Sequence, residues 1–200
     1  LGLSLEGDLH VAVQRVRGPR VALSLAFTAP QVSLEGDDPA RTAAQAASLR
    51  SELALPFVGT FENGVLSSMG FGKGASAFAV GVRRTVLSLL QTPPSQGGQA
   101  VTESREFDAN GQVRVRYTQT GEGLWQAEKQ AYLRGLYESD DDDPERRSPR
   151  PALESATGML SVQGGRLARA ERSDVVRVDL MGTGGMRSHT AVTLVLNPGA

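Results

Sequence analysis

One apolar segment, residues 75–91 (ASAFAVGVRRTVLSLLQ), constrains the fold of this chain more than any other stretch. Its apolar residues recur at the three- and four-residue spacing of an α-helix and cover most of the helix circumference. A helix that is apolar nearly all round is buried on most sides. Pro93 and Pro94 predict where it ends. The residues expected to build this central helix are Phe78, Val82, Arg84, Val86, Leu87, Leu89, Leu90 and Gln91.

Two arginines interrupt the apolar surface of this helix. Arg83 and Arg84 are sequence neighbours, so their side chains point about 100° apart around the helix axis. If the helix is enclosed by sheet, at most one of them is easily solvated. The other needs carboxylate or carbonyl partners, because an unpaired buried charge is costly.

The remainder of the chain has the alternation of β-strands, broken by Gly, Asn, Asp and Pro turns. Gly7 and Asp8 interrupt the first run, which predicts a bulge or an early hairpin. Residues 125–136 fit both helical spacing and alternation, and we interpret them as a strand because their neighbours are strands. The predicted strands cover residues 3–16, 21–32, 57–61, 65–71, 101–107, 112–120, 125–136, 156–163, 167–178 and 188–196.

A second helix is predicted near residues 39–52, as a short surface helix or an ordered loop. Asp38 supplies an N-cap, Pro39 suits the first helical position, and the alanines that follow favour helix while burying little. Together these patterns predict a mainly β (α+β) fold, in which an antiparallel β-barrel wraps around one central helix. We expect residues 1–200 to form a single domain excised from a larger protein.

Composition excludes several classes of function. The formal net charge of −1 offers no basic surface for nucleic acid. Cysteine is absent and only two histidines are present, so disulfides are impossible and a zinc site would depend on carboxylates. No apolar run approaches the roughly 20 residues that span a bilayer, and the sequence starts without a signal-peptide pattern.

Two segments carry weak signals for ligands. Gly70, Gly72 and Gly74 precede the central helix and could cradle an anion, but the spacing of a P-loop is missing and a flexible turn explains them. The acidic run 140–143 invites a calcium site, yet its spacing is not that of an EF-hand and consecutive acids usually form a solvated loop. We therefore predict no metal and no cofactor.

The sequence contains no recognisable catalytic centre. Ser188 and His189 are neighbours on a predicted strand and point to opposite faces, and His10 falls on the polar phase of its strand. A nucleophile elbow is absent. The paired carboxylates Glu103 and Glu106, and Asp174 and Asp179, fit a solvated sheet face, while Trp125 and Tyr132 fit ordinary packing. We predict that the chain is not an enzyme and has no catalytic residues.

Residues 82–91 (VRRTVLSLLQ) resemble the Ile-Lys-Arg-Gly-Ile-Leu-Ser-Leu-Leu-Gln segment of the large lipid transfer proteins, the family of vitellogenin, apolipoprotein B and the microsomal triglyceride transfer protein. Segments on both sides of this helix also resemble segments of that family, and they occur in the same order along the chain. They are residues 55–57 and 61–65 before the helix, and 106–117, 126–133 and 190–196 after it. The sequence departs from the family at Gly81 and Thr85, where Asn and Gly are usual, and in lacking the family's cysteines, with Val113 near one expected position.

The resemblance implies the N-terminal β-barrel of a lipid carrier. In that family the barrel docks partner proteins and receptors, while lipid is held by later domains. It further implies export to an extracellular or periplasmic compartment. Our leading hypothesis is therefore a non-enzymatic docking domain that supports lipid binding by downstream domains. The alternative is a structural or interaction domain of a cell-surface or envelope assembly without lipid handling. A hydrolase using His10 or His189 is a third hypothesis.

Overall fold

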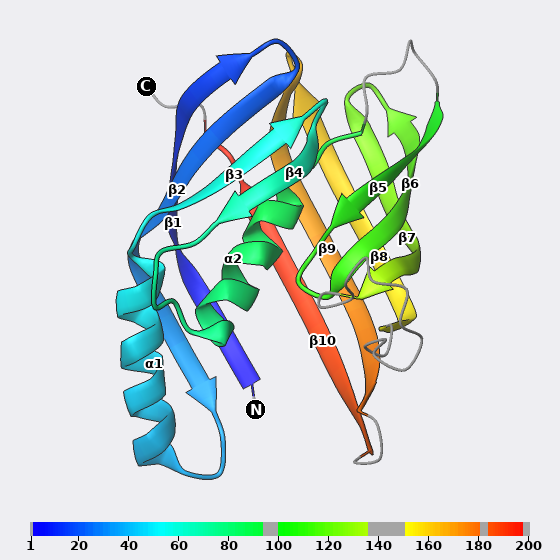
Figure 1. Ribbon diagram of the computed structural model, residues 1–200. Helices are drawn as coiled ribbons and strands as arrows, with labels where there is room; N and C mark the ends of the chain where they lie inside the picture. The colour runs from blue at the N-terminus through cyan, green and yellow to red at the C-terminus, as the bar shows by residue number, and fades with distance from the viewer. Residues whose placement is uncertain (1, 94–99, 136–150, 181–183, 198–200) are drawn as a thin grey trace, which may run out of the picture. The chain divides into compact units, whose positions relative to one another are not determined.

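The computed structural model describes residues 2–93, 100–135, 151–180 and 184–197 (Figure 1). It divides into two compact units, one of residues Leu1–Glu62 with Leu66–Thr85 and one of Asn63–Val65 with Val86–Ala200. In chain order the elements are β1 (Gly2–Arg17), β2 (Arg20–Glu35), α1 (Pro39–Leu53), β3 (Phe57–Glu62), β4 (Val65–Gly70), α2 (Ala77–Leu89), β5 (Val101–Phe107), β6 (Gly111–Gly121), β7 (Leu124–Gly135), β8 (Ala152–Gln163), β9 (Arg166–Leu180) and β10 (Gly184–Val195).

The first unit is built on a four-stranded sheet in the order β1-β2-β3-β4. β1 and β2 pair antiparallel, and the register shifts between Glu6 and Asp8, so of the two alternatives predicted at Gly7 and Asp8, a bulge or an early hairpin, the structure shows the bulge. The turn between β3 and β4 places Asn63 at φ 52° and Gly64 at φ 82°. Consecutive positive φ angles are what a two-residue hairpin turn requires, as the Asn-Gly sequence predicts.

Helix α1 packs on β2 within the first unit. Its N-cap is Asp38, whose Oδ1 accepts hydrogen bonds from the backbone N–H groups of Ala40 and Arg41, both at 3.1 Å. Pro39 occupies the first helical position, where its missing N–H costs nothing. The predicted second helix is therefore confirmed. It buries Leu49 and Leu53 almost completely, so the helix is anchored to the sheet rather than merely lying on the surface.

The second unit is built on a six-stranded sheet in the order β10-β9-β8-β7-β6-β5, in which each strand pairs with its sequence neighbour. Each of these neighbouring pairs is antiparallel. Burial alternates along β5 and β6, as a sheet with one covered face demands. The core of this unit consists of Leu89, Val113, Val115, Tyr117, Ala127, Tyr132, Leu160, Ala170 and Val176.

Helix α2 is shorter than residues 75–91. It begins after Ser76, whose Oγ accepts the backbone N–H of Ala79 at 3.2 Å. The backbone N–H of Ser76 in turn donates to the Glu52 carboxylate at 2.7 Å, and this hydrogen bond lowers the pKa of Glu52. Among the residues expected to build the helix, Val86, Leu87, Leu89 and Gln91 are buried, Val82, Arg84 and Leu90 are half-buried, and Phe78 is exposed.

The mainly β class is confirmed, but the expectation of a closed barrel is wrong. Among the described residues the strands pair into two separate open sheets, with β1 and β4 at the edges of one and β5 and β10 at the edges of the other. Alternation along a strand shows which face is buried, but it does not show which strand closes the sheet. That the chain forms a single domain stays a prediction.

Candidate functional site

Five ionisable side chains gather on the buried face of the six-stranded sheet. Glu106 comes from β5, Asp108 follows it, Lys129 lies on β7, and Arg172 and Asp174 lie on β9. Glu106 is fully buried, and Asp108, Lys129 and Arg172 are exposed by at most 8%. They share the inward phase of their strands with the apolar core, so the sheet's period of two carries them inside. We call these five residues the ionic cluster.

One half of the ionic cluster joins β5, β6 and β9. Arg172 Nη2 donates to Glu106 Oε2 at 3.1 Å and to the Tyr117 hydroxyl at 3.2 Å. The Tyr117 hydroxyl donates to the other oxygen of the Glu106 carboxylate. Burial raises the pKa of Tyr117 far above its usual value, and the negative charge of Glu106 raises it further. Burial alone would lower the pKa of Arg172, but the carboxylate of Glu106 outweighs it and the net shift is upward.

The other half joins β7 and β9 to the turn between β5 and β6. Lys129 Nζ donates to Asp108 Oδ2 at 2.7 Å and to an oxygen of Asp174. The Tyr132 hydroxyl donates to the same Asp108 oxygen at 2.8 Å, and burial, followed by the charge of Asp108, raises the pKa of Tyr132. Asp108 Oδ1 accepts the backbone N–H groups of Asn110 and Gly111 at 2.7 and 3.1 Å. One carboxylate therefore fixes a turn and holds a buried lysine.

Sequence reasoning missed this cluster. Glu106 and Asp174 were expected on a solvated face, and that expectation is wrong, because Glu106 is fully buried and the Asp174 side chain is only 13% exposed. Glu103 is exposed, as expected. The sequence does contain a signal: Glu106 shares its phase with Thr102 and Ser104, and the residues that pair with these three on the neighbouring strand β6 are apolar or aromatic, namely Val113, Tyr117 and Val115.

The geometry of the ionic cluster indicates a structural role, in which paired charges link strands of the sheet to one another. Each of its charges has an opposite charge within hydrogen-bonding distance. In the part of the chain that the structure describes, no three histidine, cysteine or carboxylate side chains gather to hold a metal ion. A buried pair of this kind is expensive to break, because removal of one partner leaves an uncompensated charge in the interior.

A second buried cation lies in the first unit, on α2. Arg83 is fully buried, and its Nη2 donates to the backbone carbonyls of Glu52 and Leu55, the latter at 3.2 Å. Its guanidinium carbon lies 5.4 Å from the centre of the Phe57 ring. Burial lowers the pKa of Arg83, and the charge of Glu52 partly offsets this. Of the carboxylate or carbonyl partners expected for one of the two adjacent arginines, the structure gives Arg83 two carbonyls.

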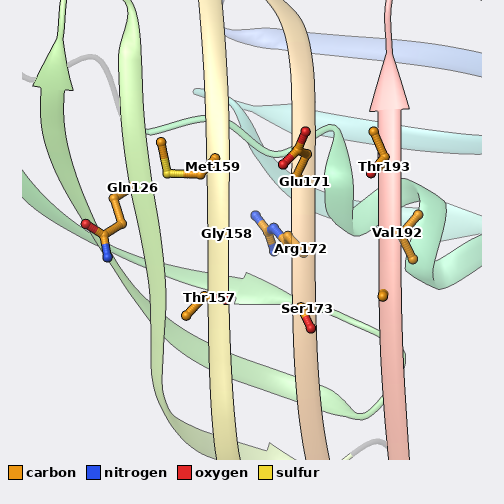
Figure 2. A pocket seen from close by; sticks show the side chains of 10 residues that line it. Gln126, Thr157, Gly158, Met159, Glu171, Arg172, Ser173, Val192 and Thr193 are labelled. Carbon is orange, nitrogen blue, oxygen red and sulfur yellow. The ribbon is translucent and has the colours of Figure 1, made fainter.

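A hollow of about 350 Å³ lies on the second unit, across β7, β8, β9 and β10. Figure 2 shows the side chains that line it. The strand registers place Gln126, Met159, Glu171 and Thr193 in one row across the four strands. The full lining consists of Gln126, Thr157, Gly158, Met159, Glu171, Arg172, Ser173, Ala191, Val192 and Thr193. Ligand sites are usually enclosed and mostly apolar, whereas this surface is open and mixed in polarity.

The two histidines do not form a catalytic centre with what surrounds them. His10 is exposed on β1. His189 Nε2 lies 3.3 Å from the hydroxyl of Ser173 on the exposed side of the neighbouring strand β9. Within the described residues no carboxylate bonds to His189 to orient its ring, and this orientation is the third element that a nucleophile and base pair needs. The arrangement is that of a surface hydrogen bond.

Of the two segments with weak signals for ligands, the structure describes only the glycine-rich one. Residues 72–75 form a turn in which the backbone N–H of Ala75 donates to the carbonyl of Gly72 at 3.2 Å, with Gly74 at φ 83°. The interpretation of this segment as a turn therefore fits. The acidic run 140–143 lies outside the described residues. None of the helices among the described residues is long and apolar enough to cross a membrane.

The fold is similar to that of lipovitellin. A solved structure of lipovitellin, reported for its lipid–protein interactions, superposes with a TM-score of 0.58 at 13% sequence identity. The match covers 99% of this chain and 24% of the lipovitellin chain, so the present sequence spans about a quarter of that protein's length. No protein-family model and no curated protein matches the sequence. The chain therefore has a lipovitellin-like fold.

Proposed function

We propose that this chain is a non-enzymatic, β-rich domain of a lipid-transfer or lipoprotein-like protein, which docks partner proteins and supports lipid binding by further domains. The observation that carries the proposal is the fold similarity: nearly the whole chain matches about a quarter of the lipovitellin chain. The resemblance of residues 82–91 to the central helix of the large lipid transfer proteins supports the same assignment from the sequence.

The physical chemistry of the second unit supports docking rather than lipid storage for this domain. Its covered face contains the ionic cluster, whose paired charges occupy space that an acyl chain would need. The hollow across β7, β8, β9 and β10 is open and includes polar side chains such as Gln126 and Glu171. Hydrocarbon gains little from such surroundings, because the hydrophobic effect requires apolar surface to be removed from water.

A second function is supported by the same surfaces. A structural or interaction domain of a cell-surface or envelope assembly would need a rigid, clamped sheet and no lipid cavity at all. The ionic cluster and the mixed polarity of the hollow suit that role equally well. The two functions differ in whether lipid accompanies the intact protein.

Native mass spectrometry with lipid extraction distinguishes the two functions. The 200-residue chain and the intact gene product are purified under mild conditions from the same host, alongside an unrelated β-rich domain of similar size that controls for adventitious lipid. Lipid that accompanies only the intact product supports the proposal. Stoichiometric lipid on the 200-residue chain contradicts the proposal that lipid is bound by further domains and not by this one. Lipid on neither form supports the interaction domain instead.

A further inference from the structure

We propose that the exposed face of β5 and β6 is a docking surface for an acidic partner protein, whose carboxylates bind Arg105 and Arg114. This inference rests on the docking function proposed above, and it adds the place and the chemistry of the contact. β5 and β6 are neighbours at one end of the six-stranded sheet (Figure 1). Burial alternates along both strands, and Arg105 and Arg114 lie on the exposed phase, away from the core. We call these two residues the arginine pair.

The strand register places Arg105 and Arg114 directly opposite each other. The backbone N–H of Asp108 donates to the carbonyl of Gly111 on the β6 side. Backbone groups alternate in direction along a strand, so those of Arg105, three residues earlier, point away from β6. The arginine pair is therefore a non-hydrogen-bonded pair, in which Cα atoms are only about 4.5 Å apart and the side chains are closest. Like charges directly opposite each other destabilise a sheet, so the free chain loses stability at this point.

The sheet supplies no counter-charge in the row of the arginine pair. In the next row, Arg116 lies between Glu103 on one neighbouring strand and Glu128 on the other. The row of the arginine pair continues instead to Ala131 on β7. Neither member of the pair forms an ion pair with any residue that the structure describes. The pair is thus a local excess of positive charge on a chain whose formal net charge is −1.

Two other arginines of the same sheet do have carboxylate partners. Arg169 on β9 forms an ion pair with Glu171, and Arg187 on β10 forms one with Glu154 at 2.7 Å. These ion pairs are exposed, like the arginine pair. Exposure alone therefore does not explain why the arginine pair has no counter-charge, and a partner that supplies one would remove the repulsion within it.

The geometry of the arginine pair favours carboxylates as its ligands. A guanidinium donates two parallel hydrogen bonds to a carboxylate, and two guanidiniums on adjacent strands are close enough to share one. Glu103 and Glu128 in the adjoining row disfavour nucleic acid, because a polyanion with a charge on every residue would bring phosphates against them. A protein segment can place an acidic side chain on the arginine pair and neutral ones beside these glutamates. An acidic protein is therefore the partner that fits this surface.

Titration of the 200-residue chain with short peptides, followed by NMR of the arginine Nε–Hε groups, tests the proposal. The probe is a peptide that alternates glutamate and serine. The matched control peptide has glutamine in place of glutamate, and a single-stranded oligonucleotide is the third ligand, all at equal ionic strength. We expect saturable shifts of the Arg105 and Arg114 resonances with the glutamate peptide. Shifts no larger than those with the glutamine peptide, or tighter binding of the oligonucleotide at the same resonances, overturn the proposal.

Paired variants separate the docking role from general charge. Arg105→Gln/Arg114→Gln should weaken binding of the glutamate peptide about fivefold or more, the value of one or two exposed charge pairs. Arg169→Gln/Arg187→Gln removes the same charge from the same sheet and should change binding little. An equal loss in both double variants overturns the proposal.

Stability provides a readout that a merely structural role would move in the opposite direction. We expect Arg105→Gln/Arg114→Gln to raise the midpoint of urea unfolding, because it removes the repulsion across the two strands. A lower midpoint would show that the arginine pair stabilises the sheet, and it overturns the proposal. Failure here is distinct from failure of the proposed function, because the lipid measurement does not depend on either arginine.

Discussion

Gly158 lies directly against Arg172 on the neighbouring strand. A β-carbon at position 158 would fall 3.2 Å from Cγ of Arg172 and 2.9 Å from the carbonyl oxygen of Glu171. The register pairs Gly158 with Ala127 on one side and with Arg172 on the other. The missing side chain is therefore what lets the arginine pass beside the strand and reach Glu106.

We expect Gly158→Ala to destabilise the second unit by about 1–3 kcal/mol, the usual cost of forcing extra atoms into a packed interior. The cost arises because the backbone carbonyl of Glu171 cannot move aside without disturbing the β8–β9 pairing. Urea unfolding monitored by tryptophan fluorescence measures it, since Trp125 packs against the core of this unit. Unchanged stability would show that the sheet relaxes around the new methyl group.

Gly81→Ala is a matched glycine-to-alanine substitution that we expect to stabilise the protein. Gly81 lies within α2, and a β-carbon there would meet nothing within 4 Å. Glycine inside a helix costs about 0.5–1 kcal/mol relative to alanine. We therefore expect a gain of that order in the free energy of unfolding, and a loss would mean that the position is more crowded than the structure shows.

Lys129→Met should be among the most damaging single substitutions in the chain. It preserves much of the side-chain volume but leaves Asp108 and Asp174 without their shared cation inside the sheet. Breaking a buried pair by removing one partner costs about 3–5 kcal/mol. Chemical denaturation followed by circular dichroism measures the loss.

The control for this prediction is Arg169→Ala, which breaks an ion pair with Glu171 whose side chains are 55% and 40% exposed. Exposed pairs are worth about 0–1 kcal/mol. Equal losses for the two variants would contradict the distinction between a buried cluster and surface pairs on which our account of the second unit depends.

Much of the fold could be predicted from the sequence because its signals are local. Asp38 and Pro39 mark the start of α1, Asn63 and Gly64 define a hairpin, and the bulge at Gly7 follows from a break in alternation. Each depends on the conformational preference of one or two residues. The structure finds all three where the sequence places them.

The ionic cluster and the pairing of the sheets could not be predicted, because both depend on contacts between distant residues. Glu106 and Arg172 are 66 positions apart, and nothing local to either residue shows that they meet. Charged residues are usually solvated, so charges in a strand-like segment favour a solvated face when only the sequence is considered. Whether the sheets close is likewise a matter of non-local pairing, which alternation does not specify.

The two ends of α2 should respond very differently to truncation. Leu89 is 1% exposed and belongs to the core of the second unit, whereas Phe78 is 38% exposed. We expect Leu89→Ala to cost about 2–5 kcal/mol, and Leu89→Asp or Val86→Asp to abolish folding, because each buries an unpaired charge.

Phe78→Ala should cost far less than Leu89→Ala, despite removing a larger side chain. Thermal unfolding of the two alanine variants provides the comparison. A Leu89→Asp protein that folds normally would show that the C-terminal end of the helix is not part of the core.

Alkaline pH should unfold the second unit through its two buried tyrosines. The pKa values of Tyr117 and Tyr132 are raised in the folded protein, chiefly by burial and then by Glu106 and Asp108. In the unfolded chain both titrate near pH 10. Below that pH both states hold the phenolic protons, so the stabilising effect is fully present. Above it the unfolded state loses protons that the folded state retains, and stability falls as pH rises.

The slope of the free energy of unfolding against pH shows how many tyrosines cause the loss of stability. Each tyrosine that is protonated only in the folded state contributes a decrease of about 1.4 kcal/mol per pH unit. We expect Tyr117→Phe to remove about half of the tyrosine contribution, whatever it does to stability at neutral pH. Urea unfolding at a series of alkaline pH values, with tyrosinate absorbance followed in parallel, measures both quantities. A slope that is the same in the unmodified chain and in Tyr117→Phe would mean that this hydroxyl ionises as readily in the folded state as in the unfolded one.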